Sequence, residues 1–477
     1  MDWKPDRNKK TPIYIQISEY IENGITDGTF PVDKPLPSER TLAQALGVNR
    51  STIVSAYAEL EASGLVERKK GSGTIISRDI WGLTKKRIPS WNKYIEAGTF
   101  LPNIPVMQRI RKETEENHLI NLASGELSAD LFPNDFIQES LMKTKFTGNL
   151  GYDHPQGNID LRNTIVEHVR EYRKIETKPE SILITSGAQQ AIHLIIQCLL
   201  KPGDAVVIEN PSYSFSLPIF KTAGLKVFHL SAEKSGWNPA ELIPIHKKHR
   251  IKMIFTNPIY QNPTGTLMSS HKRRELLNIS SEFGIPIIED DPYSLLSFTE
   301  EHPSTLKSMD VNGNVLYISS LSKIAAPGLR IGWIIGPPPV IERLADAKQQ
   351  FDFGHSTFSQ WIGNQFLSSH YLEEHLHLLK RELKSRRDAI MSNLIQYFGS
   401  HVEFQKPLGG IHLWCQFKNE VNENLLLENS IKEGVIFAPG STLGTEKGCI
   451  RLTYARGDEN TIHQGVKRLF HAFEKTR

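Results

Sequence analysis

Apolar side chains recur at intervals of three and four residues in three stretches near the amino end of the chain. These are residues 12–25, the stretch between Ser38 and Gly47, and residues 50–60. Such spacing predicts amphipathic helices, each with one buried face. Ser38 is a good N-cap and Gly47 a typical C-terminal stop, so the middle helix should span about two to three turns.

The second and third of these predicted helices are separated only by the residues GVN, and two short strands follow them. The runs LVERKK and GTIIS flank the turn KKGSG. Two short helices joined by a tight turn, the second with a polar and basic amino-terminal face, indicate a helix-turn-helix. The hairpin after them adds a basic wing.

Beyond residue 180, short β-branched runs alternate with helical stretches. The runs are continuously apolar, which is typical of strands buried on both faces of a largely parallel sheet covered by helices. The sequence therefore predicts an α/β fold for this part of the chain. The seven predicted strands are SILIT, AVVIE, LKVFHL, KMIFT, PIIED, VLYISS and RIGWIIG.

The segment between these two regions, residues 79–118, has no sustained period and contains several turn-forming residues. We expect a tether there. Its aromatic residues Trp81, Trp91 and Tyr94 favour partial docking on the larger domain, and a flexible spacer is the alternative.

Composition adds little to this division of the chain. The 477 residues exceed what one hydrophobic core usually supports. The net charge is +3, and residues 1–90 hold 14 Lys and Arg against 11 Asp and Glu, so the positive excess lies beside the helix-turn-helix. Three widely separated cysteines show no metal-ligand spacing, and no metal is expected. With no signal peptide or apolar span, a cytoplasmic location is expected.

The first domain resembles the winged helix-turn-helix of the GntR family. The resemblance rests on LPSER, LGVNRSTI, AYAELEASGL and GSGT, which occur in that order. It implies binding to operator DNA through a set of polar residues and wing glycines, namely Arg40, Asn49, Arg50, Ser51, Thr52, Gly71 and Gly73. Alternatively, Arg50 and Thr52 are solvated surface residues, Arg40 forms an ion pair, and the glycines serve only the hairpin turn.

In the larger domain, polar side chains follow the predicted strands, at the sheet edge where α/β proteins bind ligands. Lys323 follows a buried strand and could form a Schiff base, and Asp290 could pair with a protonated ring nitrogen. Together these loops suit a flat, phosphorylated, aldehyde-bearing heterocycle. Asn262 and Tyr293 would hold the ring oxygen, and Tyr213 would stack on the ring face. The phosphate would be bound by Gly187, Ala188, Ser320, Ser322 and Arg330.

These motifs resemble the fold-type I pyridoxal-phosphate aminotransferases over about residues 119–470. NPTG, EDDPY, SLSKIAAPGLRIGW and CIRLTYA occur in the family's order. The resemblance implies a mixed, mainly parallel sheet with a small C-terminal α+β domain from about residue 355, and pyridoxal 5'-phosphate as cofactor. It also implies that Lys323 carries the cofactor, that Arg451 grips a substrate carboxylate, and that Tyr152 reaches the phosphate of a partner subunit.

Each of these residues also has a purely structural interpretation. Lys323 could be a surface lysine, Asp290 a helix cap or ion-pair partner, and Arg451 part of an ordinary surface ion pair. Tyr213 and Tyr152 could serve in packing, and the remaining cofactor residues could be structural.

The order of the two modules resembles the MocR subfamily of GntR regulators. We expect a DNA-binding domain over 10–78, a linker over 79–118 and the aminotransferase-like domain over 119–477. Three hypotheses follow: a regulator that senses an amino acid or amine, a working aminotransferase with a DNA-binding arm, and a regulator whose effector is pyridoxal phosphate itself. A homodimer is expected, and the resemblance allows a domain-swapped one.

Overall fold

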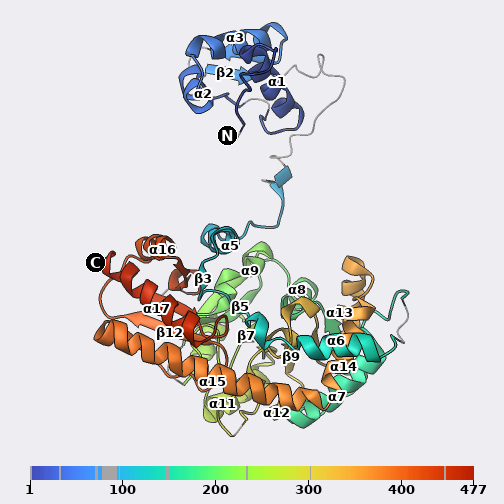
Figure 1. Cartoon of the computed structure of the whole chain (residues 1–477). Helices are drawn as coiled ribbons and strands as arrows, with labels where there is room; N and C mark the ends of the chain where they lie inside the picture. The colour runs from blue at the N-terminus through green and yellow to red at the C-terminus, as the bar shows by residue number, and fades with distance from the viewer. Residues whose placement is uncertain are drawn as a thin grey trace. The chain divides into compact units, whose positions relative to one another are not determined.

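The chain divides into two units, Met1–Thr99 and Phe100–Arg477 (Figure 1). The computed structural model describes residues 3–31, 34–69, 73–77, 94–95, 97–146, 150–232, 235–300, 302–444 and 447–477. Of the predicted DNA-contacting residues, Gly71 lies outside these ranges, as do the linker residues Trp81 and Trp91.

The first unit is a winged helix-turn-helix. Ser38 caps the second helix by accepting a hydrogen bond from the backbone of Thr41, and Gly47 ends it in the left-handed region at φ 65°. The buried faces of the helices meet in one small core around Ile17, Leu42 and Ile53. The elements are α1 (Ile13–Thr26), α2 (Glu39–Leu46), α3 (Arg50–Ala62) and the antiparallel pair β1 (Val66–Lys69) and β2 (Gly73–Ile76).

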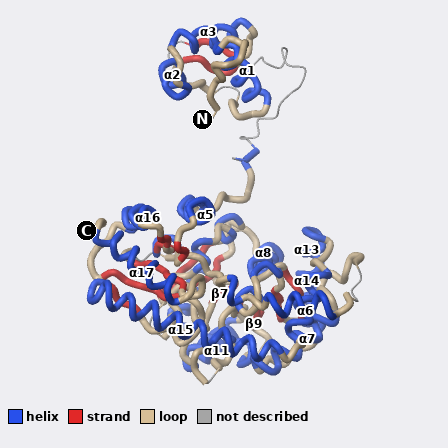
Figure 2. Tube along the Cα trace, viewed as in Figure 1, coloured by secondary structure: helices blue, strands red, loops and turns tan. Residues whose placement is uncertain are grey.

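The second unit is built on a seven-stranded sheet with helices on both faces (Figure 2). Every strand pair is parallel except the two made by β10, which runs antiparallel between β4 and β9. In the order β4-β10-β9-β8-β7-β5-β6, the strands are Ile182–Thr185, Gly332–Ile335, Val315–Ser320, Ile287–Asp290, Met253–Thr256, Ala205–Asn210 and Lys226–Ser231. The predicted mixed, mainly parallel sheet is confirmed.

Alternate residues of the same strands enter different cores. Phe255 and Ile288 pack beneath α8 (Ala188–Leu199) and α13 (Pro338–Asp352), whereas Ile254 and Ile287 pack on the opposite side with α10 (Leu242–His249) and α11 (Ser270–Phe283). Burial on both faces explains why the strands are apolar at consecutive positions. Further helices are α6 (Asn134–Lys143), α7 (Ile159–Arg173), α9 (Ile219–Thr222), α12 (Leu306–Met309) and α14 (Thr357–Leu367).

The last part of the chain forms a smaller lobe around a second sheet. Its long helix α15 (Tyr371–Phe398, orange in Figure 1) packs beside α17 (Glu459–Glu474, red). β3 (Ile120–Asn121) pairs with β13 (Val435–Ile436), so the start of the unit is tied to this lobe. The sheet has the order β11-β12-β15-β14, with strands Val402–Phe404, His412–Phe417, Cys449–Thr453 and Ala438–Pro439, and α16 is Glu423–Lys432.

The segment expected to be a tether contains a helix, α5 (Pro105–Asn117). Ile110 of α5 is buried in the main core, and the guanidinium of Arg109 is hydrogen-bonded to both carboxylate oxygens of Glu428 on α16. Its apolar residues cover little more than one turn before a run of charged residues begins, which is too short a pattern to show a helical period. Among the described residues, no helix is long and apolar enough to cross a bilayer.

Candidate functional site

The described members of the predicted DNA-contacting set lie at the surface of the first unit. Asn49 is the N-cap of α3, and Arg50, Ser51 and the half-buried Thr52 form its first turn. The guanidinium of Arg50 donates to one carboxylate oxygen of Glu39 on α2, at 3.0 Å from Nε and 2.8 Å from Nη2. This surface pair places the guanidinium of Arg50 beside Glu39 at the amino end of α3.

The two other described residues of this predicted surface also face solvent. Arg40 is exposed in the first turn of α2, and Gly73 is exposed at the start of β2, where its φ of +78° suits glycine. The described part of the predicted surface is therefore open to a partner.

In the second unit, a cavity of about 250 Å³ opens where the strands of the large sheet end. All the predicted cofactor residues except Tyr152 line it, together with five residues that the sequence did not suggest. The predicted residues are Gly187, Ala188, Tyr213, Asn262, Asp290, Tyr293, Ser320, Ser322, Lys323 and Arg330, and the additions are Gly125, Gln189, Leu217, Asn257 and Pro292.

The topology of the sheet explains this convergence. Tyr213, Asn262, Asp290 and Lys323 stand at or just beyond the carboxyl ends of β5, β7, β8 and β9, which are parallel. Arg330 precedes β10, and because β10 is antiparallel, its amino end lies at the same edge.

The amine of Lys323 lies inside the cavity and donates to the carbonyl oxygen of Gly125, with an N–O distance of 2.5 Å. Burial lowers the pKa of Lys323 to about 8, and the nearby carboxylates of Glu126 and Asp290 oppose that shift only in part. A substantial fraction of the amine is therefore neutral near physiological pH, the form required for attack on a carbonyl carbon.

The carboxyl group of Asp290 is buried at the end of β8. Its Oδ2 accepts from the Tyr213 hydroxyl at 3.0 Å, whereas its buried Oδ1 has no hydrogen-bond partner among the described residues. Burial raises the pKa of Asp290 to about 7, and the bond from Tyr213 opposes the shift. An unpaired buried carboxylate oxygen calls for a donor, such as the protonated nitrogen of a heterocycle.

A chain of polar contacts connects the cavity to the smaller lobe. Arg451 on β15 donates to Asn262 Oδ1 at 2.9 Å and to the carbonyl oxygen of Ala123 at 2.5 Å, while its buried Nε has no partner in the described chain. The Tyr293 hydroxyl lies 3.1 Å from Nε2 of His412 on β12. Burial holds the pKa of His412 well below its usual value, so this ring is neutral.

The opposite end of the cavity is suited to an anion. Gly187 (φ +80°) precedes Ala188, the first residue of α8, and the helix amino end offers free amide groups. Arg330 donates from Nη2 to the carbonyl oxygen of Ser186 at 2.5 Å, which holds the guanidinium beside this turn. Ser320 and Ser322 add hydroxyl groups.

Tyr152 does not reach the cavity of its own chain. Its side chain is 86% exposed, and its ring lies 5.8 Å from that of Phe353. His412, Gly125 and Asn257 were missed from the sequence, because a histidine inside an apolar strand and a glycine in a short loop carry no local signal of a ligand site.

The residues present fit pyridoxal 5'-phosphate. A buried amine, a buried acid with an unpaired oxygen and an anion-binding turn surround one cavity of suitable size.

Comparison with known proteins assigns both units. Residues 117–469 match the family "Aminotransferase class I and II", and residues 13–76 match "Bacterial regulatory proteins, gntR family". A Bacillus subtilis (strain 168) protein named "Uncharacterized HTH-type transcriptional regulator YisV" is 38% identical over 98% of this chain and 96% of its own length. The chain belongs to the MocR subfamily of GntR regulators.

Two further comparisons for this MocR-type chain are a transcriptional regulator and an aminotransferase of known structure. The HTH-type transcriptional regulator NorG of Staphylococcus aureus (strain USA300) is 31% identical over 92% of this chain and 99% of its own length. The crystal structure of Pyrococcus horikoshii kynurenine aminotransferase in complex with PMP superposes with a TM-score of 0.74 at 30% identity, over 83% of this chain and 98% of that one.

Proposed function

We propose that this DNA-binding transcription regulator is a cytoplasmic sensor whose second unit binds pyridoxal 5'-phosphate. The effector is a small amino acid or amine, or the cofactor itself. The observation that carries the proposal is the buried Lys323 amine in one cavity with the unpaired Oδ1 of Asp290, in a chain that begins with a GntR domain.

Each residue has a distinct part in this proposal. When bound, the cofactor supplies an aldehyde that condenses with amines and a ring that withdraws electrons. Asp290 holds the proton on its ring nitrogen, and Tyr293 and Asn262 donate to its ring oxygen. Tyr213 packs against the ring, and the turn at Gly187 and Ala188, with Ser320, Ser322 and Arg330, binds its phosphate.

Recognition of an effector carboxylate falls to Arg451, whose buried Nε has no partner among the described residues. An effector amine that replaced Lys323 on the cofactor would release the lysine from its covalent bond. A carboxylate at Arg451 would also compete with Asn262 for the guanidinium. Both changes would alter contacts between the large sheet and the smaller lobe. The effector would then bind one conformation of the protein more tightly than another, and so shift the equilibrium between them.

On the DNA side, Arg40, Asn49, Arg50, Ser51 and Thr52 would contact operator DNA, with the wing glycines Gly71 and Gly73 near the phosphates. The protein would act as a homodimer that reads two half-sites, and Tyr152 of each subunit would reach the cofactor phosphate of the other.

The proposal is tested by absorbance, chemistry and DNA binding together. Purified wild-type protein should carry a yellow chromophore that Lys323→Ala abolishes, and borohydride reduction followed by peptide mapping should tag Lys323. Labelling of another residue, or no labelling at all, would refute the proposal that the second unit is a pyridoxal-phosphate sensor. Titration with candidate amino acids should change both the absorbance and operator affinity.

A second candidate function is transamination. It is favoured by the presence of Arg451 beside a lysine whose lowered pKa suits proton transfer at a substrate carbon. Multiple turnovers with an amino acid and a keto acid would establish the enzyme. A DNA response to the cofactor alone, with no amine present, would instead support the cofactor as effector.

A further inference from the structure

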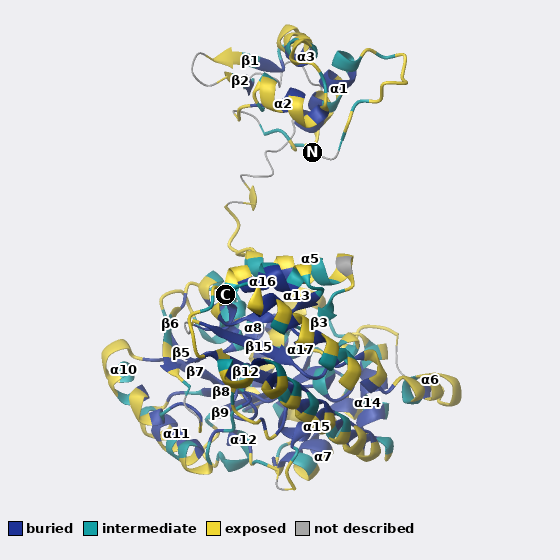
Figure 3. Ribbon diagram, turned by 60° about the vertical axis from the view of Figure 1, so that its left-hand side comes forward, coloured by how far each residue is buried: buried dark blue, intermediate teal, exposed yellow. Residues whose placement is uncertain are grey.

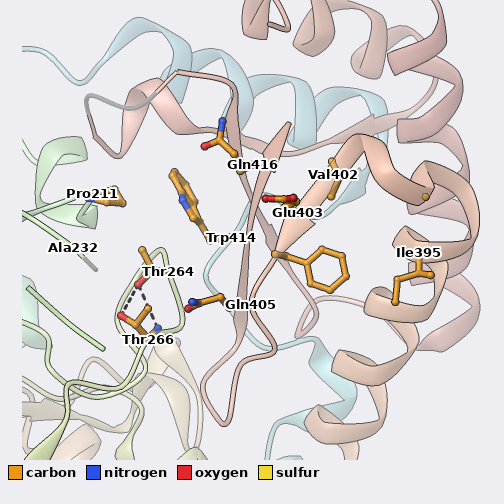
Figure 4. Close-up of a pocket in the computed structure, with 12 residues that line it drawn as sticks. Pro211, Ala232, Thr264, Thr266, Ile395, Val402, Glu403, Gln405, Trp414 and Gln416 are labelled. Carbon is orange, nitrogen blue, oxygen red and sulfur yellow. Dashed lines mark hydrogen bonds between the residues drawn. The ribbon is translucent and has the colours of Figure 1, made fainter. Parts of the chain in front are cut away.

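The second unit contains a larger cavity that shares no lining residue with the cofactor cavity. It measures about 670 Å³ and lies between the loops of the large sheet and the smaller lobe (Figure 4). Pro211, Ala232, Thr264 and Thr266 form the wall on the large-sheet side. The other wall comes from the end of α15, β11 and β12, and includes Glu403, Gln405, Trp414 and Gln416.

One face of the smaller sheet lines the larger cavity and also carries His412 and Arg451, which contact residues that line the cofactor cavity. Trp414 is paired with Arg451, and Gln416 is paired with both Glu403 and Cys449. Directly paired residues share a face of an antiparallel sheet, and so do residues two apart, so His412 joins this set. The face therefore runs from His412 and Arg451 beside the cofactor cavity to Trp414, Gln416 and Glu403 in the larger one.

The opposite face of the same strand serves the core. Leu413, Cys415 and Phe417 are buried among the apolar residues of the smaller lobe. The indole of Trp414 is only partly buried: it packs against the edge of that core and also lines the larger cavity, among Glu403, Gln405 and Gln416 (Figure 4). A large aromatic side chain on a polar, accessible face is placed to pack against a ligand.

The charged groups that line the larger cavity favour a cationic ligand over an anionic one. Glu403 contributes a carboxylate, and none of the described residues that line this cavity is Lys, Arg or His. Glu403 pairs with Lys418 at 3.0 Å, but the two side chains are 66% and 47% exposed, and such surface pairs are weak enough to exchange. An anion would find no cation on the wall, whereas a cation would find both a carboxylate and an indole face.

We propose that this cavity is a second ligand site and that it binds an aromatic ammonium compound. The ring of the ligand packs against Trp414, and its charge lies near the indole and the Glu403 carboxylate. The amides of Gln405 and the hydroxyls of Thr264 and Thr266 border the remaining space. The site does not depend on the cofactor or on the response of the DNA-binding domain.

Benzyltrimethylammonium is a suitable probe, because a quaternary nitrogen cannot condense with an aldehyde and so cannot bind by reaction at the cofactor. Calorimetric titration of the full-length protein should show saturable binding of one probe per chain. Trp414→Leu and Glu403→Gln should each weaken binding about fivefold or more. Trp414→Phe keeps an aromatic face and should lose less affinity than Trp414→Leu.

Glu420→Gln is the matched control, because Glu420 is exposed, lies just beyond β12 and does not line the cavity. It should bind the probe as wild type does. Neopentylbenzene, the neutral analogue of the probe, should bind at least about fivefold more weakly. The proposal is overturned if wild type shows no saturable binding, if Glu403→Gln and Trp414→Leu both bind normally, or if the neutral analogue binds as tightly as the cation.

Discussion

At the scale of single residues, the chemistry of the cofactor cavity depends on how far burial changes ionisation. Burial lowers the pKa of Lys323 to about 8, against about 10.4 for a solvated lysine. The neutral fraction of this amine therefore rises as the pH passes through about 8, some two pH units earlier than for exposed lysines.

This shift predicts the reactivity of the cofactor-free protein. Acylation of Lys323 by acetic anhydride, followed by mass spectrometry of its peptide across pH 6 to 11, should show a midpoint near pH 8. Exposed lysines in the same digest serve as internal controls, with midpoints near about 10.4. A midpoint for Lys323 that coincides with theirs would contradict the burial of the amine.

A second buried carboxylate, that of Asp291, follows Asp290 in the chain. The carboxylate of Asp291 forms an ion pair with Arg173, with 3.2 Å between Oδ2 and Nε, and it accepts hydrogen bonds from the Tyr317 hydroxyl at 2.7 Å and from the backbone of Ser294 at 3.0 Å. Because Asp291 follows Asp290 and precedes Tyr293, these bonds hold the turn that presents both cavity residues.

Arg173→Met should lower the free energy of unfolding by about 3–5 kcal/mol, because it leaves the Asp291 carboxylate buried without its cation. Arg170→Met is the control on the same helix: Arg170 pairs with Glu167 at 2.9 Å with both side chains largely exposed, and its loss should cost less than about 1 kcal/mol. Urea unfolding followed by tryptophan fluorescence measures both. Equal losses of unfolding free energy in the two variants would show that the buried pair stabilises the protein no more than the exposed one.

At the scale of elements, the sequence predicts the strands well because six of the seven are buried along their whole length, whereas the edge strand β6 is mostly exposed or half-buried. All seven predicted runs are strands of one sheet. The direction of β10 is not contained in its residues Gly332–Ile335, since the same apolar run suits either direction. Helix α5 was missed because its apolar stripe is short, and its stability comes from contacts with α16 and the main core, far away in the sequence.

The same reasoning applies to the cavity. Residues that follow strands, such as Asp290 and Lys323, could be predicted because the ends of parallel strands meet at one edge. His412 could not, since it enters the site from a strand of the other lobe, through its contact with Tyr293. Only the folded chain brings those two residues together.

The turn before α8 gives a prediction at this scale. Gly187 has φ 80° and ψ 174°, a conformation open only to glycine, and a Cβ there would lie 2.8 Å from Nη2 of Arg330. Gly187→Ala should therefore displace the guanidinium and weaken pyridoxal-phosphate binding by about 1.5–3 kcal/mol, as for loss of a charged hydrogen bond. Equilibrium dialysis of the cofactor measures the effect.

Gly284→Ala is the control for that experiment. Gly284 also has a positive φ, +63°, but nothing lies within 4 Å of a Cβ there. It should cost about 1 kcal/mol of stability from backbone strain and leave cofactor affinity unchanged. Loss of cofactor binding in both variants would point to general strain and away from Arg330.

At the scale of the whole molecule, four large apolar side chains of the second unit are strongly exposed. Met142 on α6, Leu150, Tyr152 and Phe353 are 87%, 83%, 86% and 63% exposed, and α6 is largely yellow in Figure 3. Tyr152 and Phe353 are in ring contact. Soluble monomers rarely leave so many large apolar side chains in water, so a homodimer through this surface is expected.

Sedimentation velocity should find wild type as a dimer, and Met142→Asp should shift it toward monomer, because a carboxylate would be buried in the interface. Val311→Asp is the control, since Val311 is 93% exposed but is not among these residues. A Met142→Asp protein that remains dimeric at low micromolar concentration would assign the interface elsewhere.

The bond between Arg451 and Asn262 has a consequence for selectivity. Before any ligand arrives, the guanidinium is already satisfied in part by the amide oxygen of Asn262 and the carbonyl of Ala123. An incoming carboxylate gains only the difference between its own bonds and those it displaces. Metabolites that bind weakly would not displace Asn262 and Ala123 from Arg451. The protein would therefore discriminate between effector and other metabolites before any reaction at Lys323.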